Sequence, residues 1–130
     1  MKYFKPEEVL PKHIPKGMLY RVMDSRILEF ADFLRGRYGK IIINDYIFGG
    51  NSQYRGLRTI ASEYYSPYSQ HSFGRAIDCL PQEATVEEII DDLRGVYLDF
   101  PVTVELGVSW LHADVRWQPT IGLYTFNKVE

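Results

Sequence analysis

The sequence predicts an α+β domain in which a mainly antiparallel sheet packs against helices. Apolar residues recur at helical spacing between Met18 and Tyr38, and a capping box formed by Thr85 and Glu88 opens a second helix. The last thirty residues instead hold three successive strand candidates. An all-parallel sheet would need a long crossover between successive strands, and none is found at the end of the chain. The order of helix, strand, loop, strand, helix and strands is therefore typical of the α+β class.

The individual elements have recognisable boundaries. Gly39 is expected to end the first helix, and the segment 40–48 is β-branched and bounded by glycines, as in a buried strand. From Gly49 to Gln70 the chain lacks clean periodicity, which predicts a long ordered loop, a kind of segment that is often functional. Further strands are expected at 75–80, 102–106, 109–117 and 121–126, and the second helix at 85–99.

Composition indicates one soluble domain spanning residues 1–130. The chain has 45% hydrophobic and 25% charged residues, a size and balance that support a core without disulfides or a structural metal. Its 15 basic and 17 acidic residues leave a formal charge of -2, which disfavours nucleic acid as a partner. Cys79 is the single cysteine, consistent with a reducing cytoplasm.

The N-terminal segment holds no apolar stretch of the length that a signal peptide requires. No other stretch approaches the length of a membrane span. We therefore expect a protein made in the cytoplasm without a signal peptide and with no membrane partner.

The strand candidate at 109–117 carries the most informative pattern. Side chains alternate between the two faces of a strand, so its apolar residues share one face and its polar and aromatic residues share the other. The apolar set is Leu111, Ala113 and Val115, and the other set is Trp110, His112, Asp114 and Arg116. A water-facing role explains Asp114 and Arg116 readily, but it explains His112 less well.

Two histidines and one carboxylate suggest a catalytic metal site. His71, Asp78 and His112 supply two imidazoles and a carboxylate, the ligand set of a zinc ion that keeps one position open. Gly74 is expected to allow a tight turn between His71 and the strand that carries Asp78, where a side chain would crowd the metal. Spacing alone leaves a solvated loop histidine as an alternative for His71.

Residues 69–78, SQHSFGRAID, fit the pattern S-x-H-x-x-G-x-A-x-D at all of its fixed positions. This motif resembles that of the zinc D-alanyl-D-alanine carboxypeptidase family, whose fold is shared with hedgehog signalling domains and D-Ala-D-Ala dipeptidases. Residues 112–116, HADVR, resemble the H-x-D-x-R/G strand of the carboxypeptidase-like and phage-encoded branches. The segment from Arg55 to Arg58, RGLR, is similar to the family's S-G-Y-R segment, so the resemblance covers roughly residues 40–118.

The resemblance implies that His71, Asp78 and His112 bind Zn²⁺ and that an arginine binds the terminal carboxylate of a peptide substrate. Arg58 fits that role, and Arg55 fits it equally well. The motif's first residue, Ser69, is a further substrate-binding candidate. Trp110 is expected either to form a wall of the site or to pack in the core.

The chain departs from the family pattern at the position of the general base. Many members place an acidic residue three positions before the second histidine, and this chain has Ser109 there, which cannot accept the proton. Asp114 and Glu105 remain as catalytic candidates, and strand geometry favours Asp114. Asp114 is equally suited to orienting a ligand histidine by accepting a hydrogen bond from the ring nitrogen that does not bind the metal.

The expected function is a zinc metallopeptidase that cleaves peptidoglycan stem peptides, of carboxypeptidase or endopeptidase type. Small members of this kind resemble phage or prophage products, such as endolysins, that reach the cell wall by a phage route or within a virion. The alternative is a catalytically degenerate module of a phage or prophage particle that keeps the zinc site for a structural or peptide-binding role. Ser109 motivates this alternative.

Overall fold

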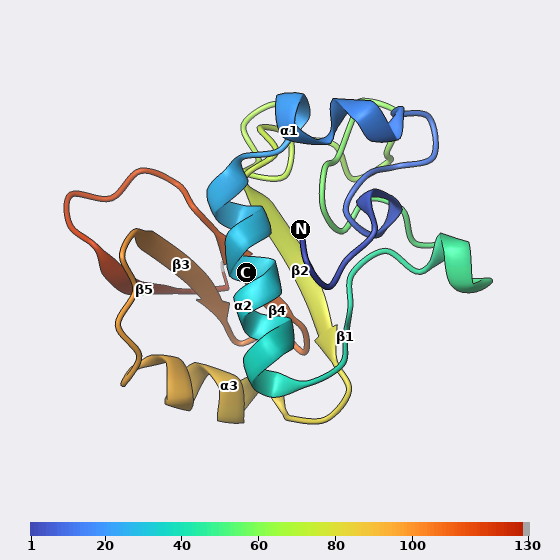
Figure 1. Cartoon of the computed structure of the whole chain (residues 1–130). Helices are drawn as coiled ribbons and strands as arrows, with labels where there is room; N and C mark the ends of the chain where they lie inside the picture. The colour runs from blue at the N-terminus through green and yellow to red at the C-terminus, as the bar shows by residue number, and fades with distance from the viewer. Residues whose placement is uncertain (129–130) are drawn as a thin grey trace.

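The computed structural model describes residues 1–128 and confirms the α+β class (Figure 1). Its helices and strands are α1 (Leu19–Val22), α2 (Ser25–Tyr38), β1 (Ile41–Ile42), β2 (Ala76–Pro81), α3 (Val86–Leu93), β3 (Pro101–Leu106), β4 (Leu111–Asp114) and β5 (Gly122–Asn127). Short 3-10 turns occupy Pro6–Glu8, Lys16–Met18 and Tyr46–Phe48. No helix within residues 1–128 has the length and apolar character needed to cross a bilayer.

The strands form a mixed five-stranded sheet within the described residues, in the order β1-β2-β4-β3-β5. The pairs β1–β2, β2–β4 and β4–β3 are antiparallel, whereas β5 lies parallel to β3 at the sheet edge. The chain leaves β4 and passes β3 before it enters β5, which explains the parallel pair. The central strand β4 therefore lies between β2 and β3, and these are the strands that build the site.

The predicted helix at 18–38 is in fact two helices. Met23 is extended (φ -117°, ψ 135°) and separates α1 from α2, and Asp24 caps α2 by accepting a hydrogen bond from the Arg26 backbone N–H at 2.9 Å. Met23 is buried, so the apolar spacing continues through the break and hides it in the sequence. An aspartate at the N-cap, which satisfies an otherwise unpaired N–H, is the sequence signal for the break.

The strands predicted at 75–80, 102–106 and 121–126 are present within one residue of those bounds, whereas three other elements are shorter than predicted. Only Ile41 and Ile42 of the segment 40–48 are paired, because the buried Asn44 turns the chain toward the N-terminal arm and donates to the carbonyls of Glu7 and Leu10. Thr85 and Glu88 form the predicted capping box, but α3 ends at Leu93. The strand predicted at 109–117 is paired only over 111–114.

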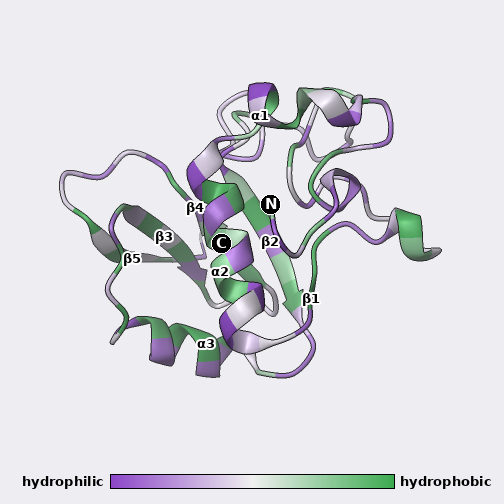
Figure 2. Ribbon diagram, in the orientation of Figure 1, coloured by the Kyte–Doolittle hydropathy of each residue, from purple (hydrophilic) through white to green (hydrophobic). Residues whose placement is uncertain are grey.

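The core lies between the sheet and helices α2 and α3. In Figure 1, α2 crosses one face of the sheet, and Figure 2 shows the apolar side of α3 turned toward the sheet. Cys79 is fully buried on β2, and burial and the nearby Asp78 carboxylate raise the pKa of its thiol. The apolar side chains of β4 (Leu111 and Ala113) also face this core, so Asp78 and His112 lie on the opposite face.

Gly74 is required by a backbone contact and not by the metal site. Its φ is +68°, and a Cβ there would collide with the carbonyl oxygen of Val22 at the end of α1. The Gly74 carbonyl in turn accepts a hydrogen bond from the Asp24 N–H at 2.8 Å. The expected tight turn is present, but the crowding that it avoids is against the helical segment.

Replacing Gly74 with alanine should therefore destabilise the fold strongly. A left-handed backbone conformation and a backbone collision together should cost about 2 kcal/mol or more of unfolding free energy. Gly17→Ala is the matched control, because no atom lies within 4 Å of a Cβ at Gly17 and its φ is not positive; it should change stability by less than about 0.5 kcal/mol. Urea denaturation followed by circular dichroism measures both, and equal stability of the two variants would contradict this account.

Candidate metal centre

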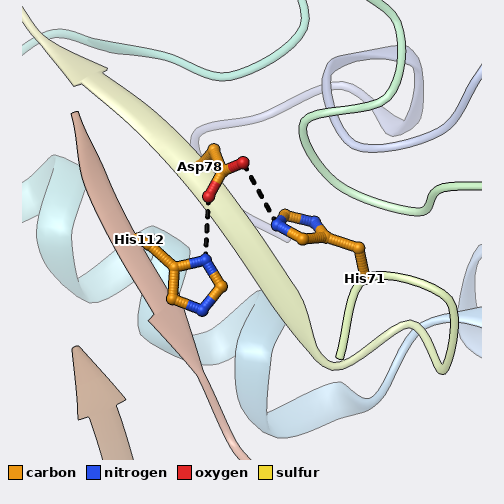
Figure 3. Close-up of side chains that lie close together, drawn as sticks. All are labelled: His71, Asp78 and His112. Carbon is orange, nitrogen blue, oxygen red and sulfur yellow. Dashed lines mark hydrogen bonds and ion pairs between the residues drawn. The ribbon is translucent and has the colours of Figure 1, made fainter. Parts of the chain in front are cut away.

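His71, Asp78 and His112 converge on one face of the sheet (Figure 3). Asp78 on β2 and His112 on β4 are direct cross-strand partners, so the antiparallel register places their side chains side by side. His71 comes from the loop that precedes β2. The structure therefore brings together all of the residues predicted to bind the metal.

The Asp78 carboxylate lies between the two imidazole rings. Asp78 Oδ1 is 2.9 Å from His112 Nδ1, and Asp78 Oδ2 is 3.1 Å from His71 Nε2. The three ligand atoms lie within 4.8 Å of one another. Zinc ligands at about 2 Å in a tetrahedral arrangement are about 3.3 Å apart, so the three groups fit one small cation with little movement.

The hydrogen bonds behind each ring fix which nitrogen is free to bind a metal. His71 Nδ1 is 2.8 Å from the carbonyl oxygen of Gly56, which can only accept, so Nδ1 carries a proton and Nε2 is the nitrogen that faces Asp78. His112 Nε2 is 2.8 Å from Asp114 Oδ2 and therefore donates to that carboxylate, which leaves Nδ1 facing Asp78. The two inward ring nitrogens and the Asp78 carboxylate thus face one point, where a proton or a metal cation can be held.

The electrostatics of the cluster also favour positive charge. Burial disfavours the imidazolium form of His112, but its hydrogen bonds to Asp114 and Asp78 outweigh burial and raise its pKa to about 9. Burial likewise opposes ionisation of Asp78, yet hydrogen bonds from His112 and His71 hold the pKa of its carboxyl far below the ordinary range. A metal ion would compete with a proton for the same position.

Asp114 is the residue that orients His112. It is fully buried and is bound by Arg116, with Nε 2.7 Å from Oδ1 and Nη2 2.6 Å from Oδ2. Both carboxylate oxygens are thus occupied, and neither reaches the cleft. Of the two roles that the sequence leaves open for Asp114, this geometry matches the orienting one.

A cleft of about 440 Å³ opens over the three ligands. Besides the ligands, its lining consists of Arg58, Tyr64, Glu105 and Trp110. Glu105 is on β3, and the β3–β4 register, extended by one residue, places it opposite His112 on the side away from Asp78. The structure therefore places Arg58, Trp110 and Glu105 in the lining of the cleft.

The other two substrate-binding candidates lie outside the cleft lining. Arg55 donates to the carbonyl of Ile43 at 3.0 Å and pairs with Asp45 at 3.7 Å, so its side chain is already occupied. Ser69 accepts a hydrogen bond from the His71 backbone N–H at 3.2 Å, which positions the ligand loop. Arg58, with Nη2 3.5 Å from Asp78 Oδ2, is the better placed of the two arginines.

Sequence reasoning missed the supporting roles of two residues at the site, Gly56 and Arg116. The Gly56 carbonyl fixes the His71 tautomer, and a Cβ on Gly56 would collide with the Val9 backbone, so only glycine brings this carbonyl to the ring. Arg116 locks Asp114, and Tyr64 lines the cleft. Gly56 and Arg116 belong to recognised motif segments, and this was the signal available for them.

Comparisons of the chain with family models, with curated proteins and with solved structures found no match. The assignment of a function therefore depends on the motifs and on the geometry described above.

Asp114→Asn should weaken metal binding by about 10- to 100-fold, because the amide no longer accepts strongly from His112 and the ring loses its fixed orientation. Asp92→Asn is the matched control, since Asp92 also pairs with an arginine (Arg37, 2.7 Å) but is distant in the chain and exposed. Competition with a chromophoric chelator measures the affinity of each variant. Wild-type affinity in Asp114→Asn, with Asp92→Asn also unchanged, would remove the orienting role.

Proposed function

We propose that this protein is a zinc-dependent peptidase that cleaves peptidoglycan stem peptides. The observation that carries the proposal is the convergence of His71 Nε2, Asp78 and His112 Nδ1 at a cleft, with each histidine ring held by a hydrogen bond on its far side. The residues that form this arrangement are those of the S-x-H-x-x-G-x-A-x-D and H-x-D-x-R motifs. Sequence motif and geometry thus support the same site independently.

Two imidazoles and one carboxylate favour zinc over the other divalent ions that a cell supplies in quantity. Magnesium and calcium prefer oxygen ligands, and closed structural zinc sites use mostly thiolates. The cleft above the ligands leaves a position open for a substrate. When bound, zinc supplies the Lewis acidity that lowers the pKa of water and polarises a carbonyl group.

Arg58 binds a substrate carboxylate in this proposal. Its guanidinium group is mostly buried at the cleft, and in the described part of the chain its Nε has no hydrogen-bond partner. An unpartnered N–H beside a 3.5 Å contact leaves donors free for a planar carboxylate. Such a contact would hold the peptide on one side of the scissile bond.

Glu105 is our candidate for the general base. It lines the cleft, whereas Asp114 is sequestered by Arg116 and His112, and Ser109 cannot accept a proton. In hydrolysis, Glu105 takes a proton from the attacking water and returns one to the leaving amine nitrogen, so that water is added across the amide bond. Trp110 and Tyr64 form walls that limit the access of further water.

The proposed family is that of the zinc D-alanyl-D-alanine carboxypeptidases, with a hedgehog/D,D-peptidase type of sheet. The mixed sheet and the two adjacent antiparallel strands that carry Asp78 and His112 are compatible with that assignment. A phage or prophage origin, with delivery to the wall by a phage route, follows from the same analogy.

Purified sacculi provide the direct test. The zinc-loaded protein should release soluble peptides or D-alanine, while a chelated sample and His112→Ala should release no more than buffer. Mass spectrometry of the soluble products identifies any bond that is cut. Wild-type release at the level of the two controls would reject the peptidase proposal.

The second candidate function is a degenerate zinc-binding module, which Ser109 at the usual acidic position favours. It predicts one zinc per chain together with a complete absence of hydrolysis. Elemental analysis of the purified protein, combined with the sacculus assay, separates the two candidates. A chain without stoichiometric metal would contradict both.

Glu105→Gln should lower kcat by about 100-fold or more while it leaves the zinc content unchanged, because the amide cannot accept the proton. Glu29→Gln is the matched control: Glu29 is an exposed residue of α2, outside the cleft lining, and its variant should retain wild-type kcat. Steady-state kinetics together with metal analysis measures both quantities. If Glu105→Gln kept wild-type kcat, the base would have to be another group.

A further inference from the structure

Phe126 lies on the same face of the sheet as the metal ligands, although it belongs to no motif. It is carried by β5, the edge strand beside β3 (Figure 1), where its cross-strand neighbour is Glu105. Neighbours paired across strands project from the same face, so Phe126 is on the face that carries Asp78 and His112. Leu123 of β5 projects from the other face and packs against the core. Phe126 is therefore the outermost member of a row of side chains that crosses the sheet at the metal centre.

The Phe126 ring reaches across β3 to the second histidine ligand. Because β3 separates β5 from β4, their backbones are two strand spacings apart, which amounts to about 10 Å. The ring centroids of Phe126 and His112 are nevertheless 6.0 Å apart, and the two ring planes meet at 84°. This distance and this angle are typical of a favourable T-shaped aromatic pair. Phe126 thus packs against His112 from the side opposite to β2, which carries Asp78.

The same ring also lies against Arg116. The central carbon of the Arg116 guanidinium group is 4.8 Å from the centroid of the Phe126 ring, which is a cation–π distance. Arg116 donates to both carboxylate oxygens of Asp114, at 2.7 and 2.6 Å, and Asp114 accepts a hydrogen bond from His112. One aromatic side chain thus contacts both the ligand histidine and the arginine at the end of the hydrogen-bond chain that orients it.

A fixed guanidinium group matters because a second acid attracts it. Glu105 on β3 attracts Arg116 electrostatically, although the hydrogen bonds of Arg116 go to Asp114. The Arg116 side chain is 34% exposed, and an ion pair alone holds a long, partly exposed side chain weakly. A turn of Arg116 toward Glu105 would have to give up the contact with the Phe126 ring. The ring therefore keeps the guanidinium on Asp114 and leaves Glu105 unpaired at the cleft.

We infer that Phe126 is a positioning residue for His112: its ring fixes the Arg116 guanidinium on Asp114 and packs against the His112 ring, so that β5 forms part of the metal centre. Phe126 is absent from the lining of the cleft and has no polar group, so it acts only through its neighbours. Its effect on zinc affinity rests on the zinc site of the proposed function. Its effect on Arg116 does not require a metal.

Phe126→Leu should weaken zinc binding by about three- to tenfold, because leucine offers no ring face to Arg116. Phe126→Tyr keeps the ring and should bind zinc within about twofold of the wild type. Competition with a chromophoric chelator measures the affinity of each variant.

Phe4→Leu is the matched control for a loss of stability. Phe4 also lies against an arginine, with the guanidinium carbon of Arg35 5.5 Å from its ring centroid, but it belongs to the apolar core. The Phe4→Leu variant should have a lower melting temperature and an unchanged zinc affinity. An unchanged affinity in Phe126→Leu, or an equal loss of affinity in Phe4→Leu, would overturn the inference.

The metal-free protein supplies a measurement that does not depend on zinc. The Arg116 Nε–H donates to Asp114, and its hydrogen should exchange with solvent at least about threefold faster in Phe126→Leu than in the wild type or in Phe126→Tyr. Nitrogen-15 NMR of the arginine side chains measures this rate. The Arg26 Nε–H, which donates to Asp24 at 3.1 Å at the start of α2, is the internal control and should exchange equally in all of the proteins. Equal exchange of the Arg116 Nε–H in all of them would overturn the inference.

The two measurements separate the positioning role from the proposed function. Faster Arg116 exchange and weaker zinc binding in Phe126→Leu, with no hydrolysis of sacculi by the wild type, would support the positioning role and reject the peptidase. Hydrolysis by the wild type, with unchanged exchange and affinity in Phe126→Leu, would reject the positioning role alone. If the wild type bound no zinc, the proposed function would fail, and the exchange measurement would decide the positioning role by itself.

Discussion

The site depends on one electrostatic constraint, namely that two imidazole rings are held against one carboxylate by hydrogen bonds on the far side of each ring. The Gly56 carbonyl and the Asp114 carboxylate each accept a hydrogen bond from the outward N–H of a histidine. A ring that turned over would lose this hydrogen bond, so both rings keep the same nitrogen toward Asp78. The Asp78 carboxylate stands between the rings. With the pKa of His112 raised to about 9, a proton lies between that ring and Asp78 at neutral pH, and a metal cation would take its place. The packing of the sheet is thereby linked to the chemistry of the cleft.

The register between β2 and β4 fixes the relative positions of these side chains. Asp78 and His112 are cross-strand partners on β2 and β4, and Ala76 lies opposite Asp114 on the same face. A slip of one residue between these strands would send one ligand into the core and bring Leu111 or Ala113 to the cleft. Because the buried face is entirely apolar, the hydrophobic effect and the ligand geometry select the same register.

Features that follow from periodicity or from neighbouring residues were predicted correctly from the sequence. Features that are set by a contact with a residue far along the chain were not. The α+β class, the capping box at Thr85 and the alternation along β4 follow from neighbouring residues and are present. The early end of β1 and the true reason for Gly74 each involve a partner far along the chain, whereas the break at Asp24 had a local signal in its N-cap aspartate. Asp114 shows the same limit, because alternation predicted the face that it occupies but not the bidentate contact from Arg116 that takes up its oxygens.

The N-terminal arm extends the dependence of the site beyond the segment that carries the motifs. Gly56 presents its carbonyl to His71 while its Cα packs against Val9, and the Leu57 N–H donates to the Val9 carbonyl at 2.9 Å. Asn44 donates its side-chain amide to Glu7 and Leu10 in the same arm. Residues that contribute no ligand thus brace one wall of the metal centre. The motif-bearing stretch is consequently not a transplantable unit: an excised or grafted version of residues 40–118 would carry every ligand and yet lack the scaffold that holds His71 in place.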